Sequence, residues 1–209
     1  MTAAATSYKY PDFDRIEIVS EPDLNFRKYD RVVPVKAGDT IPDFTFEKDN
    51  SRWQQFFNGV ATEGPVLLRQ LLHKPLIISF YSGHWQSHGV DVLKHLNAIQ
   101  LYLRKHDANL LVVSSEKDRR LDKIAWDNSL SLRFYFDNDK QIAEKFGVYS
   151  ESDPLWNRVS GIDTNVPLLA TYVVSAQGKI TYTHIDLSLS EPFPAKEIIT
   201  ALGERTFIP

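Results

Sequence analysis

Apolar and polar residues show their clearest pattern between residues 76 and 104. The run Leu76–Tyr81 is mostly apolar, too short for a helix and typical of a strand that is buried on both faces. Ser82-Gly83 interrupts this run. From Trp85 to Arg104, leucine, isoleucine and valine recur at spacings of three and four, which predicts one long helix. The chain therefore passes from a buried strand through a tight turn into a helix N-terminus, a junction at which ligands bind in open α/β sheets.

Short apolar runs and helical patterns continue to alternate along the second half of the chain. The runs predict strands at Asn109–Ser114, Leu132–Phe136, Leu168–Ser175 and Lys179–Ile185. The helical patterns lie at Lys117–Asn128, Lys140–Phe146 and Pro194–Leu202. Short links between the earlier elements favour parallel crossovers, whereas Ala176-Gln177-Gly178 is typical of a hairpin turn. This order predicts an α/β fold in which helices flank a central mixed sheet.

The amino-terminal part of the chain has no such pattern. Residues 1–34 carry acidic residues and prolines among scattered aromatics, which predicts an extended arm with one short strand at Arg15–Val19. We expect a further short strand at Phe44–Phe46. Arg52–Gln70 has little periodicity and contains glycine and Gly-Pro, so we predict a loop with a helical turn at Val66–Leu72.

Composition bounds the architecture and the compartment. With 209 residues and 43% hydrophobic content, the chain is long enough for a single core, so we expect one domain over residues 35–209 after an N-terminal extension, residues 1–34. The net charge of -3 is mixed along the chain and predicts binding to neither nucleic acid nor a membrane. No apolar run reaches membrane length and no basic-then-apolar leader is present, which predicts a cytoplasmic protein.

Cysteine is absent from the chain. Its absence excludes disulfides, cysteine-ligated zinc, iron–sulfur centres and every mechanism in which a thiolate is the nucleophile.

The strand-to-helix junction resembles a motif of a known family. The segment FYSGHWQSHG, residues 80–89, is similar to FYRGGWCPYC of the AhpC/TSA peroxiredoxin-like family, with Phe80, Tyr81, Gly83 and Trp85 matching in place. Upstream, AGDTIPDFTF resembles the family's GDxAPDFTL opening, and downstream VPLLATYVVSAQGKITYTHID is similar to LPVPATFVIDxxGxIxYAHVD. The resemblance implies a thioredoxin-like fold with the peroxiredoxin type of mixed sheet.

The departures from the family motif fall on the reactive positions. Gln86 and Gly89 stand where that family carries its two motif cysteines. Leu169 stands where the family has a proline, usually cis, and where typical peroxiredoxins carry their active-site arginine. The resemblance therefore implies a degenerate member of the family with no catalytic residue at these positions. We predict a redox-inactive protein that binds a protein or small molecule, and we assign it no cofactor.

Two other functions stay open at this point. One is an oxidoreductase that works without cysteine, through a metal held by histidines. His84 and His88 are four residues apart, share a helix face and can chelate a divalent metal, and His95 returns near that face. The simpler interpretation is a pair of solvated side chains in the first helical turn. The other function is a structural role, with a homodimer formed through a sheet edge or a helix face.

The remaining candidate binding residues surround the same junction. Tyr81 and Trp85, with Phe80, either line a small apolar pocket or fill the core. His184 matches a histidine common in the resembling family, or is a half-buried strand residue. We interpret the charged residues at positions 116–120 as a solvated helix face. The predicted binding residues are Tyr81, His84, Trp85, Gln86, His88 and His184.

Overall fold

The computed structural model describes residues 32–62, 71, 73–157, 159, 161–187 and 192–203. Most of the predicted N-terminal extension, with the strand expected at Arg15–Val19, lies outside these residues, as does most of the turn expected at Val66–Leu72. The structure therefore tests neither prediction.

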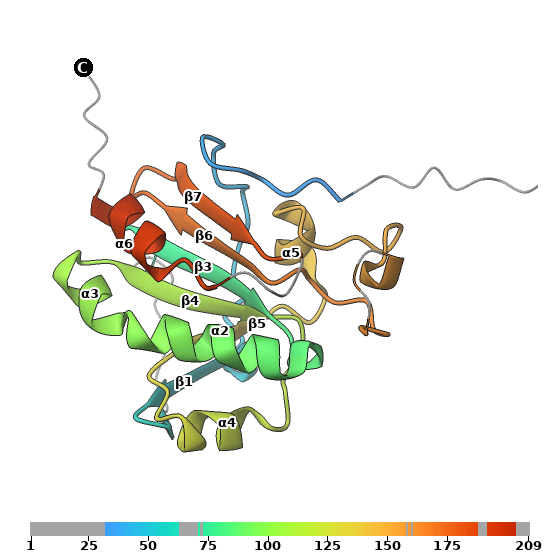
Figure 1. Ribbon diagram of the computed structural model, residues 1–209, viewed down its shortest axis with the longest axis horizontal. Coiled ribbons are helices and arrows are strands. Elements are labelled where there is room, and N and C mark those ends of the chain that lie inside the picture. Colours follow the sequence, from blue (N-terminus) through green and yellow to red (C-terminus); the bar gives the residue numbers. More distant parts are fainter. Residues whose placement is uncertain are drawn as a thin grey trace, which may run out of the picture.

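A seven-stranded mixed sheet forms the centre of the protein, in the order β2-β1-β5-β4-β3-β6-β7 (Figure 1). The strands are β1 (Trp53–Phe57), β2 (Val60–Thr62), β3 (Leu76–Tyr81), β4 (Asn109–Ser114), β5 (Arg133–Phe136), β6 (Ala170–Val174) and β7 (Ile180–Ile185). Strands β3, β4 and β5 are parallel, and β6 pairs antiparallel to β3 with Ile77 opposite Val173. This mixed sheet with a terminal antiparallel hairpin confirms the predicted fold class.

Helices cover both faces of the sheet. The α-helices are α2 (Gln86–Ala98), α3 (Gln100–Lys105), α4 (Leu121–Asp127), α5 (Gln141–Lys145) and α6 (Ala195–Gly203). Short 3-10 helices form at η1 (Asn50–Arg52), η2 (Gly83–Trp85) and η3 (Leu155–Asn157). The apolar faces of α2, α3, α4 and α6 pack in one cluster on one side of the sheet, while α5 packs on the other side (Figure 1).

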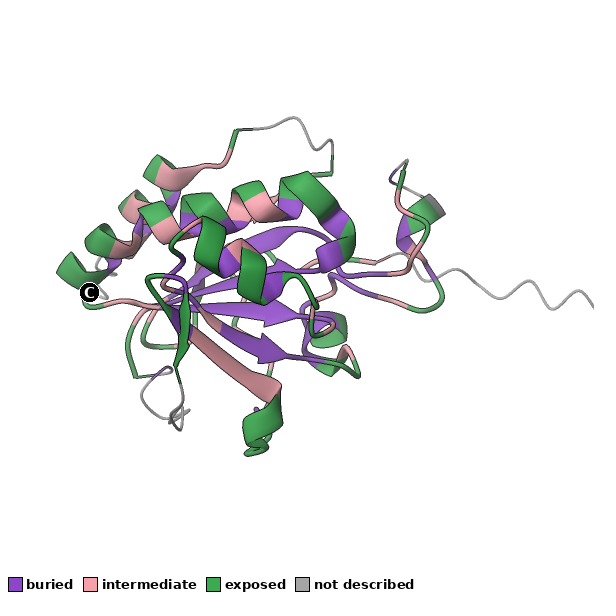
Figure 2. Ribbon diagram, turned by 90° about the horizontal axis from the view of Figure 1, so that it is seen from below, coloured by how far each residue is buried: buried purple, intermediate pink, exposed green. Residues whose placement is uncertain are grey.

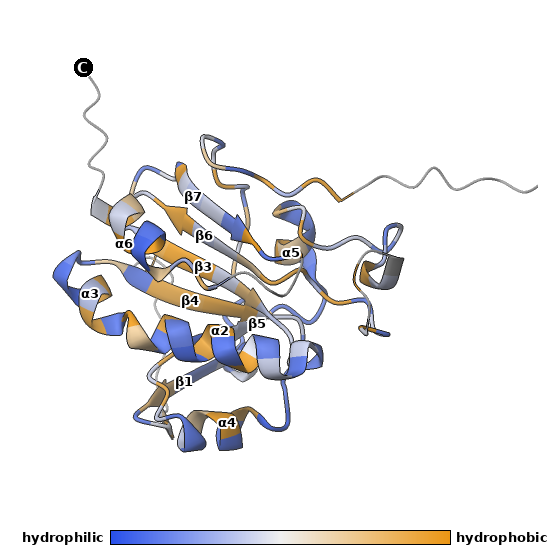
Figure 3. Ribbon diagram, viewed as in Figure 1, coloured by the Kyte–Doolittle hydropathy of each residue, from blue (hydrophilic) through white to orange (hydrophobic). Residues whose placement is uncertain are grey.

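Strand β3 lies at the centre of both clusters because all six of its residues are buried. Its alternate side chains divide between the two faces, with Ile77 and Tyr81 facing the α2 side and Ile78 and Phe80 facing the α5 side. The helices are buried towards the sheet and exposed outwards (Figure 2), and the most apolar ribbons are those of β3 and β4 (Figure 3). This burial on both faces explains why the strand has an almost continuous apolar sequence.

The prediction of a strand at Phe44–Phe46 is wrong. This segment has no regular structure, and its aromatic rings pack on the core instead. The Phe46 ring lies 4.8 Å from the ring of Tyr135 and 5.3 Å from that of Trp53, both edge to face. Burial of aromatic surface, rather than strand pairing, therefore holds the segment in place.

The prediction of a loop over Arg52–Gln70 is wrong for residues 53–62, which form the hairpin β1–β2, and residues 63–70 lie outside the described part of the chain. Asn58-Gly59 makes its two-residue turn, with φ of 46° and 80°, and Phe57 pairs with Val60 across the turn. Positive φ at both central residues is the type I′ geometry that Asn-Gly favours in hairpins.

The single helix predicted from Trp85 to Arg104 is interrupted in the structure. It begins as η2, continues as α2 and breaks at Ile99, which ends α2 and begins α3. Ile99 is only 4% exposed, so its side chain stays in the core across the break. The apolar pattern continues across the break because α2 and α3 both pack their apolar residues into the same core cluster. The sequence pattern therefore does not reveal the break.

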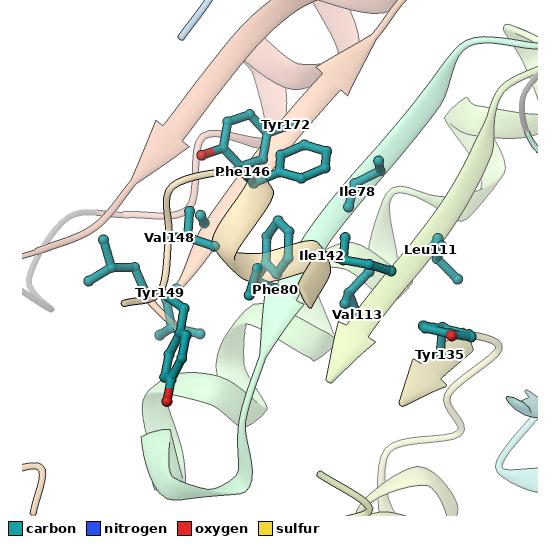
Figure 4. Packing of buried hydrophobic residues seen from close by; sticks show 14 of the residues in the cluster. Ile78, Phe80, Leu111, Val113, Tyr135, Ile142, Phe146, Val148, Tyr149 and Tyr172 are labelled. Atoms are coloured by element: carbon teal, nitrogen blue, oxygen red, sulfur yellow. The ribbon is translucent and has the colours of Figure 1, made fainter. Parts of the chain in front are cut away.

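Tyr172 has a buried hydroxyl with no hydrogen-bond partner in the described residues. Its ring is fully buried and lies 5.1 Å from the ring of Phe146 (Figure 4), and burial raises the pKa of the phenol above its ordinary value. We expect Tyr172→Phe to leave the free energy of unfolding unchanged or to raise it by up to about 1 kcal/mol, because the orphaned hydroxyl is removed. Urea denaturation measures the change.

Tyr135→Phe is the matched control, because the Tyr135 hydroxyl accepts a hydrogen bond from the backbone N–H of Glu47 at 3.1 Å. This variant should lose about 1 kcal/mol. A loss in Tyr172→Phe as large as that in Tyr135→Phe would show that the Tyr172 hydroxyl has a partner.

Candidate functional site

The junction between β3 and α2 is closed by hydrogen bonds. Ser82 ends the strand with extended backbone angles, and its hydroxyl accepts from the backbone N–H of His84 at 3.1 Å, which caps η2. Trp85 is 1% exposed, and its ring N–H donates to the carbonyl of Pro167 at 2.9 Å. The junction is thereby fixed both to the sheet and to the segment that leads into β6.

Glu116, Asp118 and Arg120, which follow β4, form what we call the 116–120 latch across this junction. One carboxylate oxygen of Glu116 accepts from the Ser82 hydroxyl at 2.8 Å and from the Gly83 N–H at 2.7 Å. The Arg120 guanidinium donates to the Gly83 carbonyl at 2.7 Å. The prediction that residues 116–120 form a solvated helix face is wrong, because α4 begins only at Leu121. Arg120 is exposed, but the Glu116 and Asp118 carboxylates bond to residues of the junction.

Asp118 is the buried member of the latch, with a side chain that is 6% exposed. Its carboxylate accepts from the Arg120 backbone N–H at 2.9 Å and from the Tyr81 hydroxyl at 3.1 Å. Burial by itself would raise the pKa of Asp118, but the hydrogen bonds from the Arg120 backbone and side chain outweigh it and hold the pKa below its ordinary value. The Asp118 carboxylate is therefore ionised at neutral pH.

Tyr81 stays protonated at the other end of this contact. Burial and the neighbouring Asp118 carboxylate both raise the pKa of its phenol above the ordinary value. The neutral hydroxyl donates to the Asp118 carboxylate, and it supplies no phenolate for chemistry.

The two positions at which the resembling motif has cysteines differ sharply in their surroundings. Gln86 is exposed and has φ of 50° and ψ of -125°, a region that costs a residue other than glycine about 1–3 kcal/mol. Gly89 is buried, and a Cβ atom added there would lie 2.9 Å from Cε2 of Tyr81 and 3.1 Å from Cβ of Trp85. The space that a side chain at position 89 would need is therefore already filled by the Tyr81 ring.

Beside the junction, α2, β6 and β7 enclose an open pocket of about 190 Å³, which we call the histidine pocket. It is lined by His88, Asp91, Val92, His95, Leu169, Thr171, His184, Asp186, Pro192 and Phe193. The ring of Phe193 stacks on that of His95 at 5.3 Å and meets His184 edge to face at 6.3 Å. One aromatic ring thus contacts two of the three imidazoles in the pocket.

The His95 ring has a defined tautomer when it is neutral. Its Nδ1 lies 2.7 Å from the backbone carbonyl of Asp91, which can only accept, so Nδ1 carries the proton. Nε2 of the neutral ring is therefore left as a hydrogen-bond acceptor. Thr171 is already occupied, because its hydroxyl bonds to that of Ser79 at 2.9 Å in the core.

The structure separates the predicted binding residues into three groups. His88 and His184 lie in the histidine pocket, together with the degenerate position Leu169. His84 in η2 and Gln86 at the start of α2 are exposed and lie outside the pocket lining. Tyr81 and Trp85 are 2% and 1% exposed, in agreement with the alternative that they fill the core.

Sequence reasoning did not select Asp91, Phe193 or the latch residues. His95 was noticed only as a third histidine near one helix face, and that spacing was the signal for its place in the pocket. Among the described residues, no group of three or more His, Asp or Glu is arranged to hold a metal ion, so no arrangement of side chains supports the metal alternative. No helix in the described part of the chain is long and apolar enough to cross a membrane.

The parallel core strands, the antiparallel hairpin and the strand-to-helix junction define a thioredoxin-like protein of the peroxiredoxin type. The chain matches the AhpC/TSA family over residues 37–183 and belongs to that family. It is 27% identical over 157 residues to the peroxiredoxin Bcp of Escherichia coli K12, which covers 75% of this chain and 90% of that protein. Because the chain contains no cysteine, the thiol peroxidase mechanism is impossible for it.

Two solved structures illustrate the similarity of fold. Mycobacterium tuberculosis AhpC superposes with a TM-score of 0.58 at 12% identity, covering 82% of this chain and 98% of that one. The reduced 2-Cys peroxiredoxin of Plasmodium vivax gives a TM-score of 0.57 at 16% identity and covers 81% of each chain. At these identities the similarity shows the fold alone.

Proposed function

We propose that the protein is a redox-inactive binding module, which holds a small polar ligand in the histidine pocket. The observation that carries the proposal is the meeting of His88 and His184 with Leu169 in one pocket, although these residues come from distant parts of the chain. The pocket's volume of about 190 Å³ is below the roughly 300 Å³ at which pockets for drug-sized ligands begin. The ligand is therefore a small molecule or the terminal group of a larger one.

The lining sets the chemistry of this ligand. Imidazoles offer both donors and acceptors, and Nε2 of neutral His95 offers an acceptor. Leu169 and Phe193 add apolar contacts to this polar lining. A ligand with a hydrogen-bond donor at one end and an apolar body fits this division, as in small-molecule sites in general.

The test is a nuclear magnetic resonance screen of histidine ring signals against a library of low-molecular-weight polar fragments. A fragment that occupies the pocket should shift the ring signals of His88, His95 and His184 together, while exposed His73, outside the pocket, stays unchanged. His184→Ala should weaken binding about tenfold, as expected for loss of one hydrogen bond in a partly buried site. His73→Ala is the matched control and should bind as the wild type does.

The proposal fails if no fragment shifts these three signals together. It also fails if His184→Ala and His73→Ala weaken binding to the same extent.

A further inference from the structure

A second pocket lies at the opposite end of the sheet from the junction. It has a volume of about 200 Å³, and its lining residues come from α3, from the end of β1 and from the starts of β4 and β5. Figure 1 shows where these elements lie in the fold. We call this second pocket the arginine pocket. Its polar lining consists of Gln55, Gln100, Arg104, Asn109, Ser131 and Arg133. None of the residues that line this pocket also lines the histidine pocket.

The charge of this pocket is positive, although the whole chain carries -3. Arg104 and Arg133 both line it, and none of the described residues in the lining is acidic. Within the described part of the chain, neither guanidinium makes a salt bridge, whereas Arg52 and Arg120 are each paired with a carboxylate. Two arginines thus line one cavity without a carboxylate among its described lining residues.

Arg133 is the half-buried member of this pair. Its Nε donates to Oε1 of Gln55 at 3.4 Å, a long hydrogen bond that neutralises no charge. Burial lowers the pKa of the Arg133 guanidinium, which means that the charged form is poorly solvated where it lies. An anion in the pocket would replace the solvation that burial removes.

The neutral side chains around the two arginines are held in fixed positions. The Ser131 hydroxyl accepts from the Asn58 N–H at 3.0 Å and keeps its own proton available for donation. The Gln100 amide donates to the Ser131 carbonyl at 2.9 Å, which ties α3 to the start of β5. The lining of the pocket therefore contains two arginines and a hydroxyl donor, and hydrogen bonds hold the backbone at Ser131 in place.

We propose that the arginine pocket binds a phosphate group, either as inorganic phosphate or as the phosphate monoester of a small molecule. A phosphate monoester carries a charge of about -1.5 to -2 at pH 7 and three acceptor oxygens, which matches two guanidinium groups better than a single carboxylate does. The guanidinium fork is the side-chain shape that binds such oxygens in pairs. This site is independent of the proposed function, since it involves neither the histidine pocket nor the junction.

The experiment titrates the full chain with inorganic phosphate, glycerol 3-phosphate and acetate at constant ionic strength set by sodium chloride. Binding is followed by the arginine Nε–H resonances and by the thermal midpoint, which a ligand of the folded state raises by mass action. We expect both phosphates, but not acetate, to shift the Arg104 and Arg133 signals. Tighter binding of glycerol 3-phosphate than of inorganic phosphate would identify the monoester as the ligand class, and the reverse order would identify free phosphate.

Arg104→Gln should weaken phosphate binding about tenfold, because one charge-assisted hydrogen bond is lost. Arg133→Gln should do the same, and since Arg104 is exposed, its variant carries the test if the Arg133 variant fails to fold. Arg119→Gln removes an exposed arginine outside the pocket and should leave the affinity unchanged. The proposal is overturned if acetate binds as well as phosphate, if neither arginine signal moves, or if Arg119→Gln weakens binding as much as Arg104→Gln.

Discussion

Hydrogen peroxide consumption by this protein, with dithiothreitol or thioredoxin as reductant, should equal the blank. Peroxide reduction in this class proceeds through a cysteine sulfur that becomes a sulfenic acid and is then reduced by a thiol, and this chain has none. A peroxiredoxin that retains its cysteine serves as the positive control in the same assay. Turnover of peroxide by the metal-stripped protein would contradict the redox-inactive proposal.

Gly89→Cys extends this prediction by returning a thiol to the junction. Its turnover should stay far below that of the positive control, because Gln86 and Leu169 supply neither a hydroxyl nor a guanidinium to stabilise the departing oxygen. The added Cβ must also displace the Tyr81 ring, which lies 2.9 Å away. Fast turnover by this single variant would show instead that only the nucleophile had been lost.

Gly83→Ala should lower the free energy of unfolding by about 2 kcal/mol, the middle of the range for overpacking a filled site. A Cβ atom at position 83 would lie 2.6 Å from Oδ2 of Asp118 and 3.2 Å from Nη2 of Arg120. Asp118 cannot move away freely, because its carboxylate is buried and also accepts from Tyr81. The methyl group therefore either breaks the latch or displaces the junction, and urea denaturation measures the loss.

The matched control is Gly203→Ala at the end of α6, where the nearest atom to an added Cβ is Cε1 of His106 at 3.7 Å, an ordinary contact. This variant should not be destabilised. The double variant Gly83→Ala with Asp118→Ala tests the cause, because removing the carboxylate relieves the clash. Its loss of unfolding free energy should therefore be smaller than the sum of the losses of the two single variants. If the two losses add fully, the clash with Asp118 is not the cause of the destabilisation by Gly83→Ala.

The apolar pattern predicted strands β3 to β7 and missed the hairpin β1–β2. Strand β3 is buried on both faces, so its sequence alone carries the signal, and the same holds for β4 and β6. Strand β1 contains two glutamines and is largely half-buried, so its pattern is weak, although the Asn58-Gly59 turn was a readable hairpin signal that we did not use. Phe44 and Phe46 were predicted as a strand because apolar alternation does not distinguish pairing from packing.

Sequence patterns predicted only two parts of the candidate site: the residues that share one helix, and the residues that match positions of the family motif. The spacing of His88 and His95 placed both near one face of α2, and the motif singled out Leu169 and His184. Phe193 reaches the pocket from a segment with no periodic pattern, so only the tertiary fold brings it there. Asp118 and Glu116 belong to a charged run that is typical of a solvent-facing helix, and their contacts with Ser82 and Gly83 depend on where β4 ends beside β3.

The latch also closes a loop in the chain. Its hydrogen bond from Gly83 to Glu116 spans 33 residues and joins the ends of the neighbouring strands β3 and β4, with α2 and α3 lying between them. Closing a loop of this length costs conformational entropy. Once the loop is closed, further contacts inside it form between segments that are already near each other. The segment from β3 to β4 therefore has the organisation of a single cooperative unit of folding. In native-state hydrogen exchange, the amides of α2 should exchange through the same opening event as those of β3 and β4, because α2 and β4 lie within the loop that the Gly83–Glu116 hydrogen bond closes and β3 pairs with β4.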